Sequence, residues 1–303
     1  MWQAKVIMQN GELMPFLDAR VHPLSLAVAY AITVFEGLRA YYHPGRKDFA
    51  IFRLDDHLKR LEVGMKLLRF ERVFERGYLK ECLAKLIRAN EPDDDVYIRL
   101  LAYIEGIGLM ATTGPVGFTA AAMPREKPKF AESGMSLGVS SWSRLSDNAS
   151  PPRIKSTANY HNARLTQLQA RADGYDGALM LTPAGKVSEA PIACFFMLRG
   201  GRLITPSVTS NILESITRDT ILTLHRELTG TQAEQREVDR SELYFADEAF
   251  LCGTGQEIIP VTAIDKLPVG DGRPGPVTTL LRKRYFDVVR GNVPEHPEWR
   301  SLV

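Results

Sequence analysis

The chain has 303 residues, 45% of them hydrophobic and 24% charged, and its 38 lysine and arginine residues against 36 aspartate and glutamate residues leave a formal charge of +2. This is the composition of a globular protein, and its length favours two domains over one. The near balance of charge argues against nucleic acid or a polybasic membrane surface as the main partner, and no stretch approaches the roughly 20 apolar residues of a membrane span.

The first part of the chain reads as a hairpin followed by helices and strands. Residues 4–14 predict two short strands around an Asn10-Gly11 turn, because this dipeptide favours tight hairpin turns. Residues 53–70 predict an amphipathic helix, since Leu54, Leu58 and Leu61 fall on one face. The same reading predicts a helix over 78–89 and strands over 96–104 and 116–123.

A charged, proline-containing stretch then interrupts the pattern. Residues 124–133 (PREKPKFAES) have no dominant period and predict a linker between a small domain over 1–123 and a larger one over 134–303. Beyond it, the sequence predicts strands over 135–142, 178–181, 194–198, 203–204 and 249–252, and helices over 159–172, 215–227 and 278–289. Gly174 is a plausible stop for the helix over 159–172.

The order of these elements indicates the fold class. Strands and helices are mixed without a regular alternation, which favours α+β domains over a Rossmann or barrel fold. The sequence has no G-x-G-x-x-G after a strand, no Walker-type phosphate loop, no G-x-S-x-G elbow and no close His/Cys cluster for zinc. We therefore expect no bound metal.

Two polar segments carry charged side chains in unusual places. Lys155 lies in R-I-K-S-T-A-N-Y, which runs into a helix, and Glu189 lies in V-S-E-A-P, beside an apolar strand. Taken alone, each has an ordinary explanation that is favoured: Lys155 as a solvated loop lysine and Glu189 as a turn residue that points outward. A carboxylate that enters a buried strand is nevertheless rarely left unpaired.

Two further segments resemble anion sites. Ser215 begins S-I-T-R-D at a helix start, where free N–H groups bind anions but where capping is also a sufficient explanation. The run C-G-T-G-Q-E (252–257) follows an apolar strand and lets the backbone approach an anion, although an ordinary turn has the same composition. Together, a lysine, a carboxylate and two anion cups are the parts that pyridoxal phosphate requires.

The chain resembles the branched-chain amino acid aminotransferases, which belong to the class IV (fold type IV) pyridoxal-phosphate enzymes. The resemblance covers nearly the whole chain, and its segments occur in the family's order: TVFEGLRAY (33–41), IFRLDDHLKRL (51–61), YIR (97–99), KSTANY (155–160), VSEA (187–190), SITRD (215–219), LYFADEAFLCGTGQEI (243–258) and GPVT (275–278). It implies an α+β, two-domain fold like that of D-amino acid aminotransferase, with pyridoxal 5′-phosphate between the domains. It also implies a transaminase that moves the amino group of Leu, Ile or Val to 2-oxoglutarate in ping-pong order.

The resemblance assigns cofactor roles residue by residue. Lys155 matches the catalytic Schiff-base lysine, Glu189 the carboxylate at the pyridine nitrogen, and Tyr160 the phenol at the ring hydroxyl. Arg60 matches the phosphate-binding arginine. The other matching positions are Leu213, which packs on the ring, and the phosphate-binding Ile216, Thr217 and Thr254.

Substrate positions follow from the same resemblance. Phe35, Tyr97 and Arg99 match pocket positions, Tyr30 matches a residue contributed across the interface of a homodimer, and Gly255 and Gln256 lie in the loop that receives the substrate carboxylate. The sequence departs from the family at Ala31-Ile32, where Gly-Thr is common, at Ser215, which replaces a glycine, and in the 124–133 stretch, which lacks the usual tryptophan and tyrosine. Arg125 or Lys127 is the expected replacement there, near the mouth of the pocket.

These departures leave alternatives for the activity. One is a class IV transaminase of shifted specificity, toward D-amino acids or (R)-amines, or an enzyme similar to aminodeoxychorismate lyase. Another is a non-catalytic cofactor-binding homologue, which the intact Lys155, Glu189, Tyr160 and Arg60 argue against. Three widely spaced cysteines and no visible secretory signal suit a soluble protein of the reducing cytoplasm.

Overall fold

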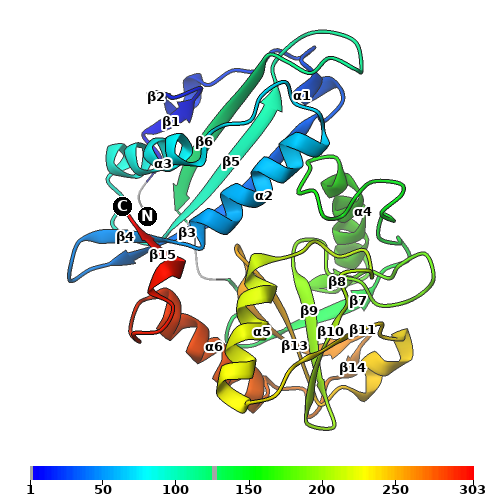
Figure 1. Cartoon of the computed structure of the whole chain (residues 1–303). Helices are drawn as coiled ribbons and strands as arrows, with labels where there is room; N and C mark the ends of the chain where they lie inside the picture. Colours follow the sequence, from blue (N-terminus) through cyan, green and yellow to red (C-terminus); the bar gives the residue numbers. More distant parts are fainter. Residues whose placement is uncertain (1–2, 125–127) are drawn as a thin grey trace. The chain divides into compact units, whose positions relative to one another are not determined.

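Two compact units, each built around its own sheet, make up the chain (Figure 1). The computed structural model describes residues 3–124 and 128–303. Among these, the first unit holds 3–124, 154–158 and 287–303, and the second holds 128–153 and 159–286. Residues 125–127 of the expected linker, with Arg125 and Lys127, lie outside the described residues. Within the described ranges, no helix has both the length and the apolar content needed to cross a membrane.

The first unit is a seven-stranded antiparallel sheet in the order β15-β4-β3-β5-β6-β1-β2. Its strands are β1 (Val6–Gln9), β2 (Glu12–Pro15), β3 (Thr33–His43), β4 (Asp48–Phe52), β5 (Val96–Ile104), β6 (Val116–Pro124) and β15 (Arg300–Leu302). Its helices are η1 (Phe16–Asp18), α1 (Leu26–Ala29), α2 (Leu54–Leu67), α3 (Arg76–Asn90) and η3 (Pro297–Trp299).

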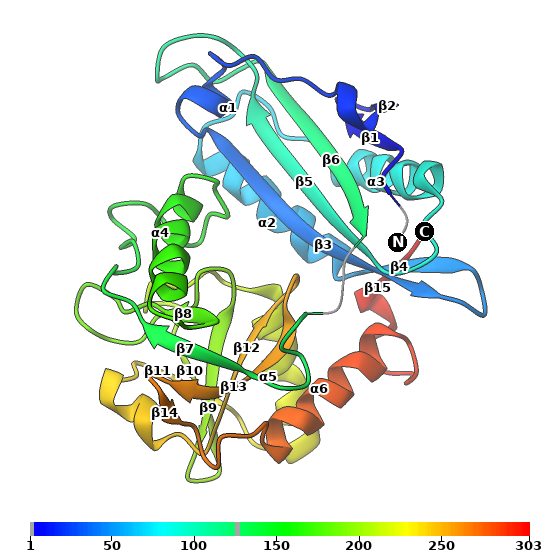
Figure 2. The same ribbon diagram turned by 180° about the vertical axis from the view of Figure 1, so that it is seen from behind.

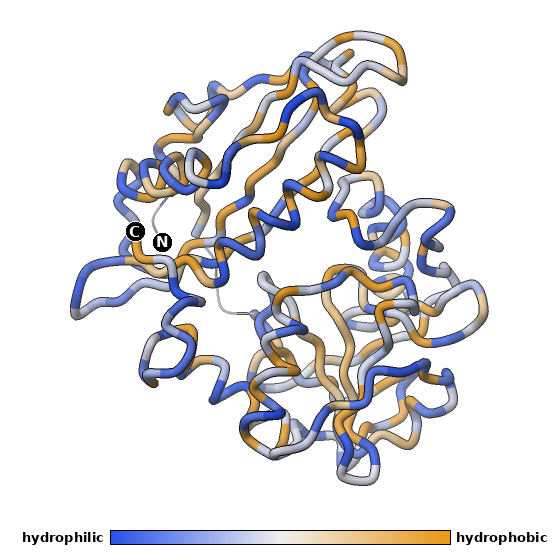
Figure 3. The backbone as a smooth tube through the Cα atoms, in the orientation of Figure 1, coloured by the Kyte–Doolittle hydropathy of each residue, from blue (hydrophilic) through white to orange (hydrophobic). Residues whose placement is uncertain are grey.

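The two long helices of this unit, α2 and α3, cover the same face of the sheet (Figures 1 and 2). Their apolar stripes, with Leu58, Met65 and Leu83, pack on Leu38 and Ile98 of the strands. In Figure 3 the helices alternate between hydrophilic and hydrophobic colour along their length, as amphipathic helices do. The opposite face of β3 and β5 carries other side chains, among them Phe35 and Arg99.

The second unit is an eight-stranded mixed sheet in the order β11-β10-β9-β12-β13-β7-β8, with β14 beside β13. Its strands are β7 (Met135–Val139), β8 (Gly177–Leu179), β9 (Cys194–Arg199), β10 (Arg202–Pro206), β11 (Glu234–Arg236), β12 (Glu248–Gly253), β13 (Glu257–Ile264) and β14 (Leu267–Pro268). Its helical elements are α4 (Asn159–Ala172), α5 (Ile216–Thr229), η2 (Arg240–Phe245) and most of α6 (Pro276–Val289). Phe195, Met197, Leu251, Ile259 and Val261 form the centre of its core.

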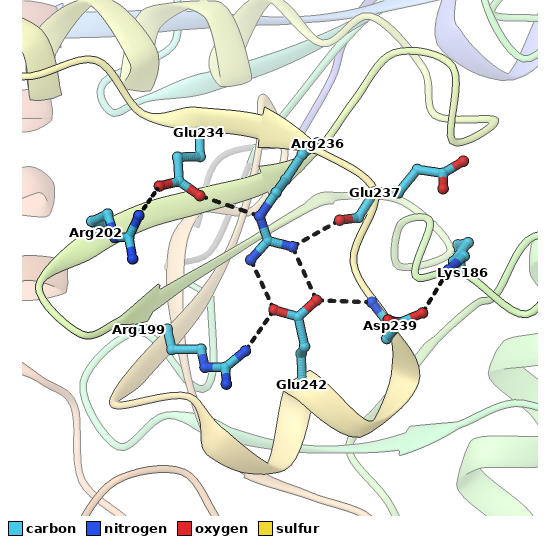
Figure 4. A network of polar contacts seen from close by, with 8 residues as sticks. All are labelled: Lys186, Arg199, Arg202, Glu234, Arg236, Glu237, Asp239 and Glu242. Carbon is cyan, nitrogen blue, oxygen red and sulfur yellow. Dashed lines mark hydrogen bonds and ion pairs between the residues drawn. The ribbon is translucent and has the colours of Figure 1, made fainter.

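A polar network fastens η2 to the edge of this second sheet (Figure 4). Arg236 donates to both carboxylate oxygens of Glu242, at 2.9 and 2.8 Å, and Arg199 adds a third bond of 2.7 Å. Glu242 in turn accepts from the Asp239 amide and so completes a capping box at the start of η2. The network ties β9, β11 and η2 together through charge-assisted bonds.

The α+β prediction is confirmed, and several elements match their predicted bounds. Strand β5 and helix α4 begin and end where the sequence indicated, and Gly174 follows α4 with the positive φ of a helix stop. Strand β7 ends at Val139, three residues early, because the Ser141 amide bonds to the Gln169 side chain instead of to a strand.

Two segments from late in the chain join the first unit. Strand β15 pairs with β4, and residues 154–158 lie beside β3 through hydrogen bonds from Phe35 to Lys155 and from Thr157 to Thr33. The domain bounds expected from the sequence place both segments in 134–303. Hydrogen bonding between distant parts of the chain, which no local pattern reveals, decides their place.

Candidate active site

The segment that carries Lys155 is held against the first half of β3. The Phe35 amide donates to the Lys155 carbonyl at 2.9 Å, the Thr157 amide donates to the Thr33 carbonyl at 3.0 Å, and Ser156 forms a β-bridge with Val34. The Thr157 hydroxyl adds a bond to the Ala31 carbonyl at 3.1 Å. The lysine is therefore on a backbone fixed by the sheet, although it lies in a loop.

The Lys155 side chain meets a cluster of aromatic and cationic side chains from β3 and β5. Its Nζ lies 5.0 Å from the centroid of the Phe35 ring, and the Arg99 guanidinium carbon lies 5.1 Å from the same centroid. The register pairs Phe35 with Leu101 and Gly37 with Arg99, so these side chains share one face of the sheet. The structure thus brings together three predicted site residues, Lys155, Phe35 and Arg99.

Tyr97 joins this cluster across a glycine. Its hydroxyl accepts a 3.4 Å bond from Arg99, and a Cβ atom added to Gly37 would lie 2.2 Å from that hydroxyl oxygen. Only a residue without a side chain leaves room for the phenol. Gly37 therefore sets the position of Tyr97 over β3.

Arg60 takes part in a buried ion pair on the helix-covered face. Its Nε and Nη2 each donate to the Glu36 carboxylate at 2.7 Å, and His57 Nδ1 lies 2.7 Å from Oε2 of the same group. Burial alone would raise the pKa of Glu36, but the charges and hydrogen bonds of Arg60 and His57 lower it to about 2. Burial lowers the pKa of His57, so this histidine is a neutral hydrogen-bond donor.

Glu189, in the second unit, is a buried carboxylate held from three sides. Arg144 Nε donates to Oε1 at 2.9 Å, the Leu213 amide donates to Oε2 at 3.2 Å, and the Cys194 thiol lies 3.8 Å from Oε2. The arginine is itself 7% exposed, so water screens this pair little. Both carboxylate oxygens of Glu189 therefore accept hydrogen bonds, one from Arg144 and one from the Leu213 amide.

The start of α5 presents backbone donors as the sequence predicted. Ser215 caps the helix by accepting from the Arg218 amide at 3.2 Å, and the Asp219 amide bonds to the Ser215 carbonyl. Among the described residues, no hydrogen bond uses the amides of Ile216 and Thr217. Two free N–H groups at the positive end of a 14-residue helix form a site for an anion.

Thr254, Gly255 and Gln256 form the turn between β12 and β13. The ladder pairs Gly253 with Glu257, and the Gln256 amide donates to the Gly253 carbonyl at 3.0 Å. Within the second unit, α5 also packs on β12, whose end carries this turn. The turn is thus a defined hairpin end rather than an irregular loop.

Two predicted site residues, Tyr30 and Tyr160, lie at the ends of helices. Tyr30 ends α1 with 45% of its surface exposed, and in the described part of the chain its side chain makes no hydrogen bond or ring contact. Tyr160 is the second residue of α4 and is half-buried.

Sequence reasoning overlooked Glu36, His57 and Arg144. A signal existed for the first two, because Glu36 is a carboxylate in an otherwise apolar strand, and His57 and Arg60 are three apart on one helix face. Arg144 lies in an irregular segment, and only the fold shows its contact with Glu189. The described residues contain no group of three His, Cys, Asp or Glu side chains able to hold a metal ion.

Comparison with known proteins gives one consistent answer. The family model for amino-transferase class IV matches residues 33–264. A branched-chain-amino-acid aminotransferase of Pseudomonas aeruginosa is 38% identical over 98% of this chain and 97% of its own. Among solved structures, the branched-chain amino acid aminotransferase of Thermobaculum terrenum in its pyridoxal-phosphate form is 40% identical, with a TM-score of 0.93 over 100% of this chain and 99% of that one. The Escherichia coli branched-chain enzyme is 34% identical, with a TM-score of 0.92 over 99% of each chain.

Proposed function

The chain belongs to the amino-transferase class IV family, and from this premise we propose that it transfers the amino group of Leu, Ile and Val to 2-oxoglutarate in ping-pong order, with pyridoxal 5′-phosphate as cofactor. The observation that carries the proposal is the cluster of Lys155, Phe35 and Arg99 on one face of β3 and β5. It unites an amine, an apolar surface and a cation, which a transaminase of apolar amino acids and a dicarboxylic oxo acid requires.

The residues present fit the proposed cofactor. A phosphate ester needs donors, and Arg60, the unused amides of Ile216 and Thr217, and the Thr254 hydroxyl supply them. A pyridine nitrogen that stays protonated needs a carboxylate, and Glu189 is one whose charge Arg144 supports. Tyr160 and Leu213 are assigned to the ring hydroxyl and the ring face.

When bound, pyridoxal phosphate supplies a ring that stabilises negative charge at the substrate α-carbon. Lys155 would hold the cofactor through its amine, and the same amine, released when the substrate amine takes its place, would move the proton between the substrate Cα and the cofactor C4′. Glu189 keeps the proton on the ring nitrogen, because an ionised carboxylate favours a cationic neighbour. Leu213 helps by fixing the orientation of that carboxylate through its amide.

The same pocket has to accept two kinds of side chain. Phe35 offers an apolar surface to Leu, Ile or Val, whereas Arg99 binds the second carboxylate of 2-oxoglutarate. The backbone of Gly255 and Gln256 is assigned to the substrate α-carboxylate. Ala31 and Ile32 depart from the family pattern, and Ile32 packs on the core of the first unit.

The test is a product assay with 2-oxoglutarate as amino acceptor. L-leucine, D-alanine and (R)-1-phenylethylamine are compared as donors under the same conditions, and glutamate is measured. We expect L-leucine to be the best donor. A preference for either of the other two amines would replace the branched-chain assignment, and no glutamate from any of them would contradict a transaminase.

We further propose that the protein is a homodimer of the cytoplasm. Its support is an apolar surface of the first unit, formed by Leu24, Val28 and Tyr30 at α1 and by Ile107, Leu109 and Met110 in the loop between β5 and β6, all of them exposed. A β-bridge between Ser25 and Ile107 attaches the loop to α1, and a cavity of about 480 Å³ opens beside Val28. Patches of this kind mark protein interfaces.

The homodimer has its own test. Light scattering should give twice the 33.9 kDa chain mass, and Leu109→Glu should shift the protein toward the monomer. A monomeric wild-type protein with full activity would contradict a shared site. Three buried cysteines that form no disulfide are compatible with the cytoplasmic location.

A further inference from the structure

Glu36 is a fully buried carboxylate in the middle of a strand that otherwise contributes to the core. The register of β3 places it between Val34 and Leu38 on the face that α2 covers, where it has 0% exposure. Burying a charge in such surroundings is costly, and an apolar pair of similar volume is often as stable as a buried ion pair. Stability alone therefore does not account for a buried carboxylate at position 36.

The contacts of Glu36 point to another role. It accepts three hydrogen bonds of 2.7 Å: two from Arg60, through Nε and Nη2, and one from His57 Nδ1. Two parallel bonds to one carboxylate fix the plane of a guanidinium group, which a single bond does not do. Glu36 engages Nε and Nη2 of Arg60, and Nη1 takes no part in this pair of bonds.

His57 completes the arrangement from one helical turn away. It is 1% exposed and lies three residues before Arg60 on α2, so both side chains reach the same carboxylate from one helix. An ionised carboxylate only accepts, so the histidine carries its proton on Nδ1. Since its pKa is lowered, with the nearby charge of Lys155 contributing, His57 donates without adding a charge.

We propose that Glu36 is the positioning residue for Arg60, and that with His57 it holds the guanidinium in the orientation that binds the phosphate of the cofactor. The inference rests on the proposed function, in which Arg60 binds this phosphate. Its benefit is pre-organisation, because the flexible arginine is fixed before the phosphate arrives. Glu36 itself touches neither the cofactor nor the substrate and acts only through Arg60.

The test separates phosphate recognition from folding. Wild type and variants of the full chain are freed of cofactor and titrated with pyridoxal phosphate and with pyridoxal, which lacks the phosphate, and the visible absorbance is followed. The measured quantity is the ratio of the pyridoxal Kd to the pyridoxal phosphate Kd. Glu36→Gln should lower this ratio about tenfold, because a glutamine offers one acceptor oxygen to three donors.

Three further variants make the result specific. Arg60→Gln should lower the ratio at least as much, and adding Glu36→Gln to Arg60→Gln should change it by less than about twofold, since one residue acts through the other. Glu248→Gln is the matched control, because Glu248 is also buried but bonds to the start of α6 through Val277 and Thr278. It should lower the melting temperature and leave the ratio unchanged.

The outcomes separate the positioning role of Glu36 from the proposed transaminase function. If Arg60→Gln lowers the ratio but Glu36→Gln leaves it unchanged, or if Glu36→Gln acts equally in both backgrounds, the positioning role is overturned and the transaminase stands. If Arg60→Gln leaves the ratio unchanged, the phosphate assignment of Arg60 also fails. If Glu36→Gln does not fold, Glu36→Asp and His57→Phe are titrated instead, and an unchanged ratio in both overturns the proposal.

Discussion

Lys155 is tied to Phe35 twice, by a 2.9 Å hydrogen bond from the Phe35 amide to its carbonyl and by the 5.0 Å approach of its Nζ to the Phe35 ring. The backbone bond fixes where the lysine begins, and the ring limits where its amine can go. A ring face attracts a cation but offers no hydrogen bond that would compete for the amine.

Phe35→Leu should reduce activity without preventing folding. Leucine keeps the backbone bond and much of the apolar volume but removes the ring face shared by Lys155 and Arg99. We expect kcat/KM for L-leucine to fall about tenfold, because the amine is then less well positioned. Steady-state kinetics check this, and an unchanged kcat/KM would show that the ring plays no part in placing the lysine.

Gly37→Ala should disturb Tyr97. The added methyl group would lie 2.2 Å from the Tyr97 hydroxyl oxygen, so the phenol has to move. We expect a loss of about 1–3 kcal/mol in the free energy of unfolding, measured in urea, together with a higher KM.

Gly77→Ala is the matched control for this change. Gly77 lies in α3, and nothing lies within 4 Å of its added Cβ atom. It should stabilise the protein by up to about 1 kcal/mol and leave KM unchanged. If both variants behaved alike, the space over Gly37 would not matter.

Arg99→Gln should separate the two half-reactions. The exposed guanidinium is assigned to the second carboxylate of 2-oxoglutarate, a group that leucine lacks. We expect KM for 2-oxoglutarate to rise about tenfold or more, and KM for L-leucine to change by less than about threefold. Arg46→Gln, which removes a surface pair with Asp48, should alter neither value. Equal effects on both substrates would contradict the assignment.

Glu242 should contribute to stability in a defined pH range. Its hydrogen bond from Arg236 is the largest cause that lowers its pKa from 4.5 to about 2. A group with a lowered folded-state pKa stabilises above its unfolded-state pKa, and this contribution is lost as the pH falls through the folded-state pKa. Glu242→Gln should therefore cost about 1 kcal/mol at pH 7, a difference that shrinks between pH 4.5 and 2.

Urea unfolding across this range measures the effect. Glu237→Gln serves as the control, because the Glu237 side chain points away from the network and only its carbonyl accepts from Arg236 (Figure 4). It should have little effect at any pH. A Glu242→Gln deficit that stayed constant down to pH 2 would contradict the role of its charge.

The sequence predicted local features better than long-range ones. Helix α4 and strand β5 have strong periodic patterns, and their predicted bounds match. The eleven-residue β3 was not predicted, because Glu36 and Gly37 interrupt its apolar pattern, and both are explained only by partners far along the chain, Arg60 and Tyr97.

Long-range contacts in the candidate active site were likewise not predicted from the sequence. The resemblance named Lys155, Arg60 and Glu189, but not the side chains that hold them. Arg144 is 45 residues from Glu189 in sequence, and Glu36 is 24 residues from Arg60. Such supporting contacts depend on strand register and on how a helix packs on a sheet, which the spacing of residues in one chain does not encode.

The central claim is that Lys155 is the residue that bonds to the cofactor. The most direct measurement is borohydride reduction of the protein loaded with pyridoxal phosphate, followed by peptide mapping with mass spectrometry, which identifies the amine joined to the cofactor. The account predicts the label on the peptide that contains Lys155, and its loss together with transaminase activity in Lys155→Arg. A label on another lysine, or full turnover by the variant, would contradict it.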